Sequence, residues 1–359
     1  TMCELIMPLP GETKETFIKG LNNILNANTT TVTIYTLMML HGTEFKNPQY
    51  RDKFKYKCKF RIVPLNFGEY DGRKIMDYEE VGVEHKDLSF EDYLYIRVLS
   101  LLVESLHNGK AFYEFFKFSK KFDIQPASLL RILYDNISDS SKNIQKLINE
   151  FVNETKNELW DSEENLVEYY KKDKNYLKLK NGEVGGNLIY KYKSKSLVET
   201  GLDWIDYIEK QILKLVVDKQ TNINSAKIIR SELSEIASFC RLKINALLNA
   251  DIETKPVEDI FSYDILKWLD DEKANKRLSD YKFSSDSEKL IFEFTKDQMA
   301  MRKDVFKRYG TSVNAISKIV TRISNLESQF RKVRYENDNY LRDIYKNVGE
   351  NFVKYSLSN

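Results

Sequence analysis

The chain has 359 residues, of which 42% are hydrophobic, and 56 Lys and Arg against 54 Asp and Glu give it a net charge of +2. This composition supplies apolar residues for packed cores, which excludes a wholly disordered or collagen-like protein, and the length allows about two domains. The near-neutral charge argues against a protein that binds nucleic acid mainly through its phosphates. No apolar run approaches the roughly 18 residues of a membrane-spanning helix.

The start of the chain predicts a strand, a helix and a second strand. Residues 3–9 are almost continuously apolar, which is typical of a parallel strand covered on both faces. Residues 14–26 carry apolar side chains at helical spacing, and residues 32–40 form the second strand. A helix between two strands favours a right-handed parallel crossover. The loops 9–13 and 40–44 are then expected at the same end of the pair, where α/β proteins bind ligands.

The remainder of the chain predicts a mainly helical region. Short strands are expected at 59–65 and 78–84. The expected helices are Ser89 to about Leu106, 111–122, 125–136, 140–156, 163–172, 197–217, 225–249, 257–271, 299–309 and 313–331, with short strands at 280–283 and 289–294. The predicted organisation is an α/β start, 1–85, and a mainly α-helical C-terminal region, 86–359. That region has room for two lobes, 86–250 and 251–335, before a polar tail.

Isolated reactive side chains indicate no site by themselves. Cys3, Cys58 and Cys240 are far apart in the sequence and form no CxxC pair. We therefore expect neither a disulfide nor a metal site built from this chain alone. The absence of disulfides predicts a cytoplasmic location. The aromatic residues of 112–118 predict core packing. The basic and aromatic segment 191–195 predicts a solvated face rather than contact with an anion.

The most specific string is ELIMPLPGET, residues 4–13. It describes a strand that meets a tight turn and the start of a helix, and an ordinary turn of an α/β protein has the same pattern. Glu4 interrupts the apolar strand and shares the side of Ile6 and Pro8 by the two-residue period of a strand. Because a buried carboxylate is costly without a partner, Glu4 is expected to contact a donor or a ligand.

This string and TIYTLMMLHGTEF, residues 33–45, resemble the late barrel strands of radical S-adenosylmethionine enzymes. The resemblance is best to the cobalamin-associated branch, where strings like ELILGLPGET and LPGTEL occur, and residues 78–83 resemble the segment that follows the barrel. It covers about the first 100 residues. Pro8 stands where the family usually has glycine, and His41 where the second loop usually has proline. The cluster loop CxxxCxxC does not occur in the chain.

The resemblance implies that residues 1–85 are the last strands of an incomplete TIM-like barrel and that the chain is the C-terminal part of a longer enzyme. The whole enzyme would cleave S-adenosylmethionine reductively at a 4Fe-4S cluster to start radical chemistry, with cobalamin as a further cofactor. Its partners would be a reductant protein, such as flavodoxin or ferredoxin, and a small-molecule or glycan-type substrate. No nucleic acid and no membrane would be involved. The isolated chain is expected to be inactive.

Residue by residue, the resemblance assigns ten positions to S-adenosylmethionine: Glu4, Ile6, Pro8, Gly11, Glu12, Tyr35, Leu37, Leu40, Gly42 and Thr43. Ile6 would pack on the adenine, Pro8 would take the usual glycine position, and Glu12 would brace the loop. Neither a catalytic residue nor a metal ligand is assigned within this chain.

Two alternatives remain open at the level of sequence. The long helices and the near-neutral charge also suit a non-enzymatic helical adaptor, in which the small α/β start is only scaffold. A degenerate homologue that has lost catalysis is a third interpretation, and Pro8 is the departure that supports it.

Overall fold

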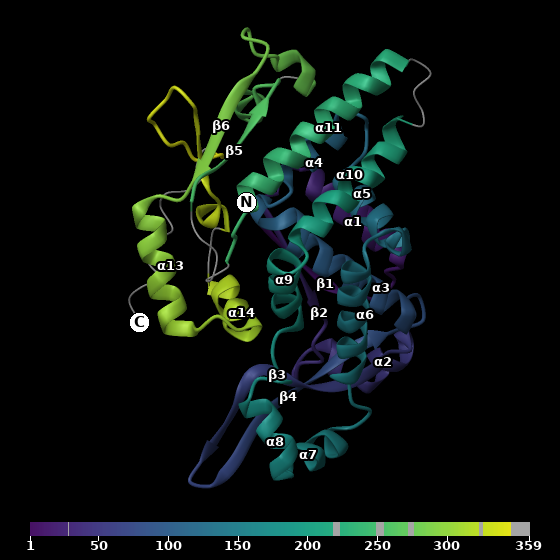
Figure 1. Ribbon diagram of the computed structural model, residues 1–359. Helices are drawn as coiled ribbons and strands as arrows, with labels where there is room; N and C mark the ends of the chain where they lie inside the picture. The colour runs from purple at the N-terminus through teal and green to yellow at the C-terminus, as the bar shows by residue number, and fades with distance from the viewer. Residues whose placement is uncertain (28, 218–222, 249–254, 272–275, 323–325, 346–359) are drawn as a thin grey trace. The chain divides into compact units, whose positions relative to one another are not determined.

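The computed structural model describes residues 1–27, 29–217, 223–248, 255–271, 276–322 and 326–345. The chain divides into two compact units, which we describe separately. Figure 1 labels their helices and strands. Unit 1 is Thr1–Glu104 with Gln145–Lys193, and unit 2 is Ser105–Ile144 with Ser194–Asn359. The α/β start and mainly helical remainder are present, whereas the described strands form small sheets and none of these sheets is closed.

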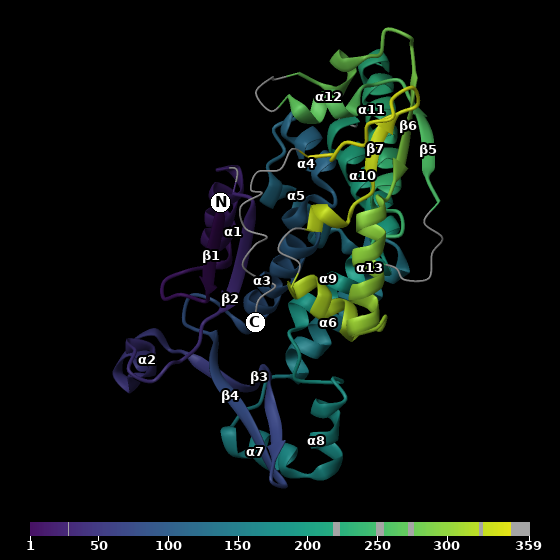
Figure 2. The same cartoon turned by 90° about the vertical axis from the view of Figure 1, so that its left-hand side faces the viewer.

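Unit 1 begins with the predicted strand–helix–strand. Its elements are β1 (Met2–Met7), α1 (Lys14–Asn26), β2 (Thr31–Thr36), α2 (Pro48–Phe54), β3 (Lys57–Tyr70), β4 (Arg73–Glu84), α3 (Phe90–Leu102), α7 (Glu163–Lys171), α8 (Asp173–Lys180), most of α6 (Lys142–Asn157) and the first half of α9 (Leu188–Val198). The strands β1 and β2 pair in parallel, which confirms the predicted parallel pairing, and α1 lies beside them in Figure 2. Thr13 and Thr16 close a capping box at the start of α1.

The strands β3 and β4 form one long hairpin that the sequence only partly predicts. They are 14 and 12 residues long, so the short strands expected at 59–65 and 78–84 underestimate them. The turn between them places Asp71 and Gly72 at φ +48° and +73°, as in the Asp-Gly turns that suit a right-twisted hairpin. Helices α7 and α8 pack on the hairpin through a small core that contains Ile62, Leu166 and Tyr176.

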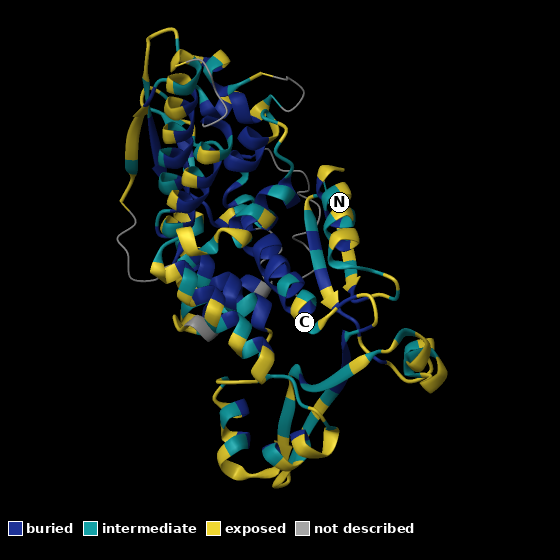
Figure 3. Cartoon of the chain, turned by 90° about the vertical axis from the view of Figure 1, so that its right-hand side faces the viewer, coloured by how far each residue is buried: buried dark blue, intermediate teal, exposed yellow. Residues whose placement is uncertain are grey.

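Unit 2 is mainly helical. Its elements are α4 (Tyr113–Lys120), α5 (Pro126–Asp135), α10 (Gly201–Val217), α11 (Ile223–Ile244), β5 (Val257–Phe261), α12 (Ile265–Asp270), β6 (Glu288–Glu293), α13 (Lys296–Tyr309), α14 (Val313–Arg322) and β7 (Lys332–Tyr335), with the second half of α9. The three strands form an antiparallel sheet in the order β5-β6-β7. Many residues of these helices are buried, and Figure 3 colours them dark blue. No helix in the described ranges is both long and apolar enough to cross a membrane.

Several predictions for unit 2 are corrected. Residues 257–271 are not one helix, because their first five residues pair with β6 as strand β5 and only 265–270 are helical. The first half of the expected strand 280–283 lies in a 3-10 turn, Leu278–Tyr281, and Lys282 forms only an isolated bridge with Tyr263. The expected core role of the aromatic segment 112–118 is confirmed, since Phe112, Phe115, Phe116 and Phe118 are buried.

Candidate functional site

The sheet of β1 and β2 has one buried face and one open face. Phe17 and Leu21 of α1 are buried together with Val32 of β2, so the apolar stripe of the helix and alternate strand residues form a core. On the other face, the side chains of Ile6 and Tyr35 lie opposite each other and are 46% and 48% exposed. The prediction that this strand is covered on both faces is therefore wrong for the part of the chain that the structure describes.

The carboxyl ends of β1 and β2 lead into two turns of the same kind. The N–H of Glu12 donates to the carbonyl of Leu9 at 3.1 Å, with Gly11 at φ +79°. The N–H of Thr43 donates to the carbonyl of Leu40 at 3.2 Å, with Gly42 at φ +84°. A positive φ at the third position of a turn favours glycine. The two predicted loops therefore follow parallel strands at the same end of the sheet.

The first of these loops rests on side chains from the hairpin region. The Tyr56 hydroxyl donates to the carbonyl of Pro8 at 3.1 Å, and the ring of His85 packs edge-on against Tyr56. Burial raises the pKa of Tyr56 and lowers that of His85, so both side chains are neutral at pH 7. Burial also raises the pKa of Glu12, and contact with the backbone of Leu9 opposes that shift. The hydrogen bond from Tyr56 and the packing of His85 on its ring thus hold the loop 9–13 in place.

The ten residues that the resemblance assigns to the cofactor are not equally accessible. Seven are exposed: Glu4, Ile6, Gly11, Tyr35, Leu40, Gly42 and Thr43. Glu12 is half-buried, whereas Pro8 and Leu37 are buried. The N–H of Leu37 donates to the carbonyl of Met7, and its carbonyl accepts from Gly82, which holds Leu37 between two strands. Pro8 and Leu37 therefore support the site but do not present side chains on its surface.

The expectation that Glu4 is buried is wrong, because its side chain lies on the open face. Its partner is Tyr35. The pKa of the Tyr35 phenol is raised mainly by burial, then by the charges of Glu4 and Glu104 and by a hydrogen bond to Glu4. Tyr35 is therefore a neutral hydroxyl at pH 7 and donates to the Glu4 carboxylate. The open face thus combines two large side chains, Ile6 and Tyr35, with one anionic acceptor.

A hollow of about 80 Å³, lined by both charged and apolar residues, adjoins this face along β2. It is lined by Thr33, Ile34, Tyr35, Thr36, Arg61, Pro64, Arg97, Ser100, Glu104, Glu158 and residues 186–190, all within unit 1. Arg61 donates to Glu79 at 2.6 Å and to Glu158 at 3.0 Å, and the two carboxylates keep the pKa of the guanidinium high despite its burial. The sequence does not predict this hollow, because its residues come from five separate segments.

The segment 191–195 is buried or half-buried and is not the solvated face that the sequence predicts; its first three residues belong to unit 1. The side chain of Tyr192 is fully buried against Phe151, and Lys191 pairs with Glu154 at 2.7 Å. Lys193 pairs with Glu104 at 3.0 Å beside the hollow. Lys191 and Lys193 are therefore engaged with specific carboxylates and not left to solvent.

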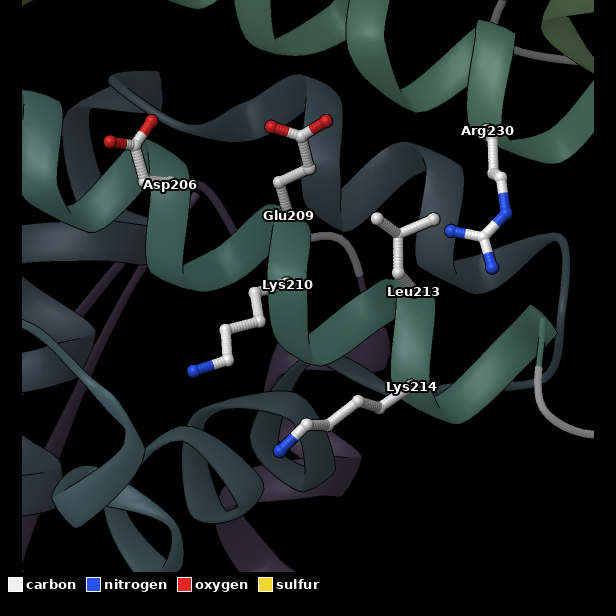
Figure 4. Close-up of a pocket in the computed structure, with 6 residues that line it drawn as sticks. All are labelled: Asp206, Glu209, Lys210, Leu213, Lys214 and Arg230. Atoms are coloured by element: carbon white, nitrogen blue, oxygen red, sulfur yellow. The ribbon is translucent and has the colours of Figure 1, made fainter.

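A second hollow, of about 400 Å³, lies open on the surface of unit 2 between α10 and α11. Figure 4 shows Lys210 and Lys214 pointing away from Asp206 and Glu209 along α10. Lys214 pairs with Asp139 at 2.6 Å, and Lys210 donates to the carbonyl of that residue. Arg241 of α11 contacts the two acidic residues of α10. This hollow is a network of paired surface charges and is a weaker candidate for a site.

The thiols of Cys58 and Cys240 suit packing better than iron ligation. Burial raises the pKa of Cys58 to about 11, and it raises that of Cys240 well above its usual value. A cluster ligand is a thiolate, which a raised pKa disfavours. Across the ranges that the structure describes, no three His, Cys, Asp or Glu side chains gather to hold a metal ion. No family model matches the chain, and no curated protein matches it.

Proposed function

We propose that this chain supplies part of the S-adenosylmethionine-binding barrel of a radical S-adenosylmethionine enzyme of the cobalamin-associated branch. The observation that carries the proposal is the open face of the β1–β2 sheet. Ile6, Tyr35 and Leu40, which the resemblance places near the adenosine, are exposed by 46%, 48% and 52%. Exposed apolar side chains gathered at the carboxyl ends of parallel strands are typical of a ligand site.

The chemistry of this face suits an adenosine. Ile6 and Tyr35 sit opposite each other across the sheet and offer a broad apolar surface to a planar base. The Glu4 carboxylate accepts hydrogen bonds, which suits a ribose hydroxyl or an exocyclic amine. Pro8 and Leu37 hold the strands in place from within the fold. In this role the chain binds and orients the adenosine and covers one side of it from water.

The edges of the sheet support the same proposal. Among the described residues, β1 has no strand beside it other than β2. An unpaired edge next to an exposed apolar face is a liability that a closed barrel removes. We therefore propose that an earlier barrel strand pairs with the outer edge of β1.

We expect the cluster ligands to come from another segment, because the three cysteines of this chain form no CxxxCxxC loop and burial raises the pKa of the half-buried Cys58 and the buried Cys240. In this family the cofactor at the 4Fe-4S cluster supplies the radical that starts the reaction, while the protein positions and shields it.

The coding sequence upstream of Thr1 tests the proposal. We expect the reading frame to continue upstream and to encode CxxxCxxC, and a cobalamin-binding domain would fix the branch. A frame that encodes the barrel without the cysteines would indicate a degenerate homologue. An in-frame stop and a start codon directly before Thr1 would overturn the proposal and favour the helical adaptor.

A further inference from the structure

Arg97 of α3 is a buried cation in the hollow beside β2. Its relative exposure is 6%, and its guanidinium stacks on the ring of Phe151 at 5.8 Å. Its Nε is buried and has no hydrogen-bond partner. Throughout the described ranges, no carboxylate forms an ion pair with Arg97. A buried charge without a partner is costly, so its presence in a hollow points to a ligand of opposite charge.

The other charged groups of the hollow are already paired. Arg61 is held by Glu79 and Glu158, at 2.6 and 3.0 Å. Glu104, which lies on the same helical segment as Arg97, accepts from Lys193 at 3.0 Å and from Thr33 at 3.2 Å. Each of its two oxygens thus accepts one hydrogen bond from another donor, and no ion pair joins it to Arg97 among the described residues. Of the two arginines that line the hollow, Arg61 has carboxylate partners, whereas Arg97 forms no ion pair with a carboxylate within the described part of the chain.

A second feature of the hollow also favours an anion. Residues 186–190, which include the first turn of α9, line it. The side chain of Asn187 accepts the N–H of Tyr190, as expected of a residue that caps the start of a helix. The amino end of a helix carries a partial positive charge and attracts anions. Arg97 and this helix end therefore act on the same small space.

The volume limits what the hollow admits. The hollow is small, about 80 Å³, so the group that we consider for it is a single carboxylate or phosphate. A guanidinium binds either group through paired hydrogen bonds. The rest of a larger ligand would lie outside, over Tyr35.

We propose that the Arg97 hollow binds the carboxylate or phosphate group of a small anionic ligand, held by the Arg97 guanidinium and the first turn of α9. This inference does not depend on the radical function. If both hold, the hollow anchors the anionic end of the substrate beside the adenosine-binding face.

The test is calorimetric titration of this chain with inorganic phosphate and, separately, with acetate, without S-adenosylmethionine. We expect at least one anion to bind saturably and to slow hydrogen exchange in residues 94–104 and 186–193. Arg97→Met should weaken that binding at least tenfold without lowering the melting temperature, because it removes an unpaired buried charge. The matched control is Arg73→Met, which removes an exposed arginine of the same unit and should leave binding unchanged.

Binding of phosphate alone or acetate alone would assign the class of ligand. Arg97→Lys provides a second variant that keeps the charge and loses the paired geometry, so it should fold and bind several-fold more weakly. If neither anion binds, or if Arg97→Met and Arg97→Lys both bind as well as the unmodified chain, the inference is wrong. Because S-adenosylmethionine is left out, such a failure would not bear on the proposed radical function.

Discussion

Replacing Ile6 by glutamate is expected to weaken S-adenosylmethionine binding about 10- to 100-fold in the complete, cluster-loaded protein. Burial of an isoleucine side chain against a ligand contributes about 1.5–3 kcal/mol, which corresponds to that range of affinity. The new carboxylate would also lie beside Glu4 and near the base. Ile6 is 46% exposed in the structure, so the substitution should not unfold the sheet. Equilibrium binding of the cofactor measures the effect.

The matched control is Met2→Glu. Met2 lies on the same strand and the same face and is 70% exposed, but it is about 13 Å away at roughly 3.3 Å per residue, at the amino end of the strand. It should leave cofactor affinity unchanged, because α/β proteins bind ligands at the carboxyl ends of parallel strands. Equal loss in both variants would indicate a general effect of charge on this face, and no loss in Ile6→Glu would remove Ile6 from the site.

Lys243→Met is expected to destabilise unit 2 by about 3–5 kcal/mol, because it leaves a buried carboxylate without its cation. Lys243 and Glu114 are both fully buried, and their Nζ and Oε2 atoms are 2.6 Å apart. The Lys243 ammonium also donates to the carbonyl of Lys110 at 3.0 Å and to the Tyr345 hydroxyl at 2.7 Å. Methionine keeps the length of the side chain and supplies none of these donors. Denaturant unfolding measures the loss.

The same cluster provides its own control. Glu114 accepts from Tyr345 at 2.6 Å and from Cys240 at 3.3 Å, and glutamine in its place keeps an acceptor and removes the charge. Adding Glu114→Gln to Lys243→Met should therefore recover at least half of the lost stability. A loss below about 1 kcal/mol for Lys243→Met alone would show that the pair does not behave as a buried ion pair.

The sequence predicts the strand–helix–strand well because each of its parts depends on local signals. The helical spacing of Phe17 and Leu21, the capping residue Thr13 and the Pro10-Gly11 turn all act within a few residues of each other. The hairpin was underestimated for a local reason too. Pro64 interrupts β3 where its register with β4 shifts, and proline within a strand pattern weakens the prediction of a strand.

The remaining differences come from tertiary contacts that no local pattern reveals. Val257 opens a strand because it pairs with Phe292 of β6, 35 residues further along the chain. In the sequence, Arg97 is one charged residue in an apolar helix. Only the fold places it in a hollow together with Thr33 and the start of α9. Glu4 was expected to be buried because its neighbours are apolar, whereas the face it occupies is open. Periodicity identifies the face of a strand but does not show what covers that face.

The measurement that tests the central claim most directly is formation of 5′-deoxyadenosine by the protein translated from the complete reading frame. The protein would be reconstituted anaerobically with iron and sulfide, reduced with dithionite and supplied with S-adenosylmethionine. We predict that 5′-deoxyadenosine forms, that it depends on the CxxxCxxC cysteines expected upstream, and that Ile6→Glu lowers its formation while Met2→Glu does not. A protein that binds a 4Fe-4S cluster through those cysteines and yields no 5′-deoxyadenosine would contradict the proposed function.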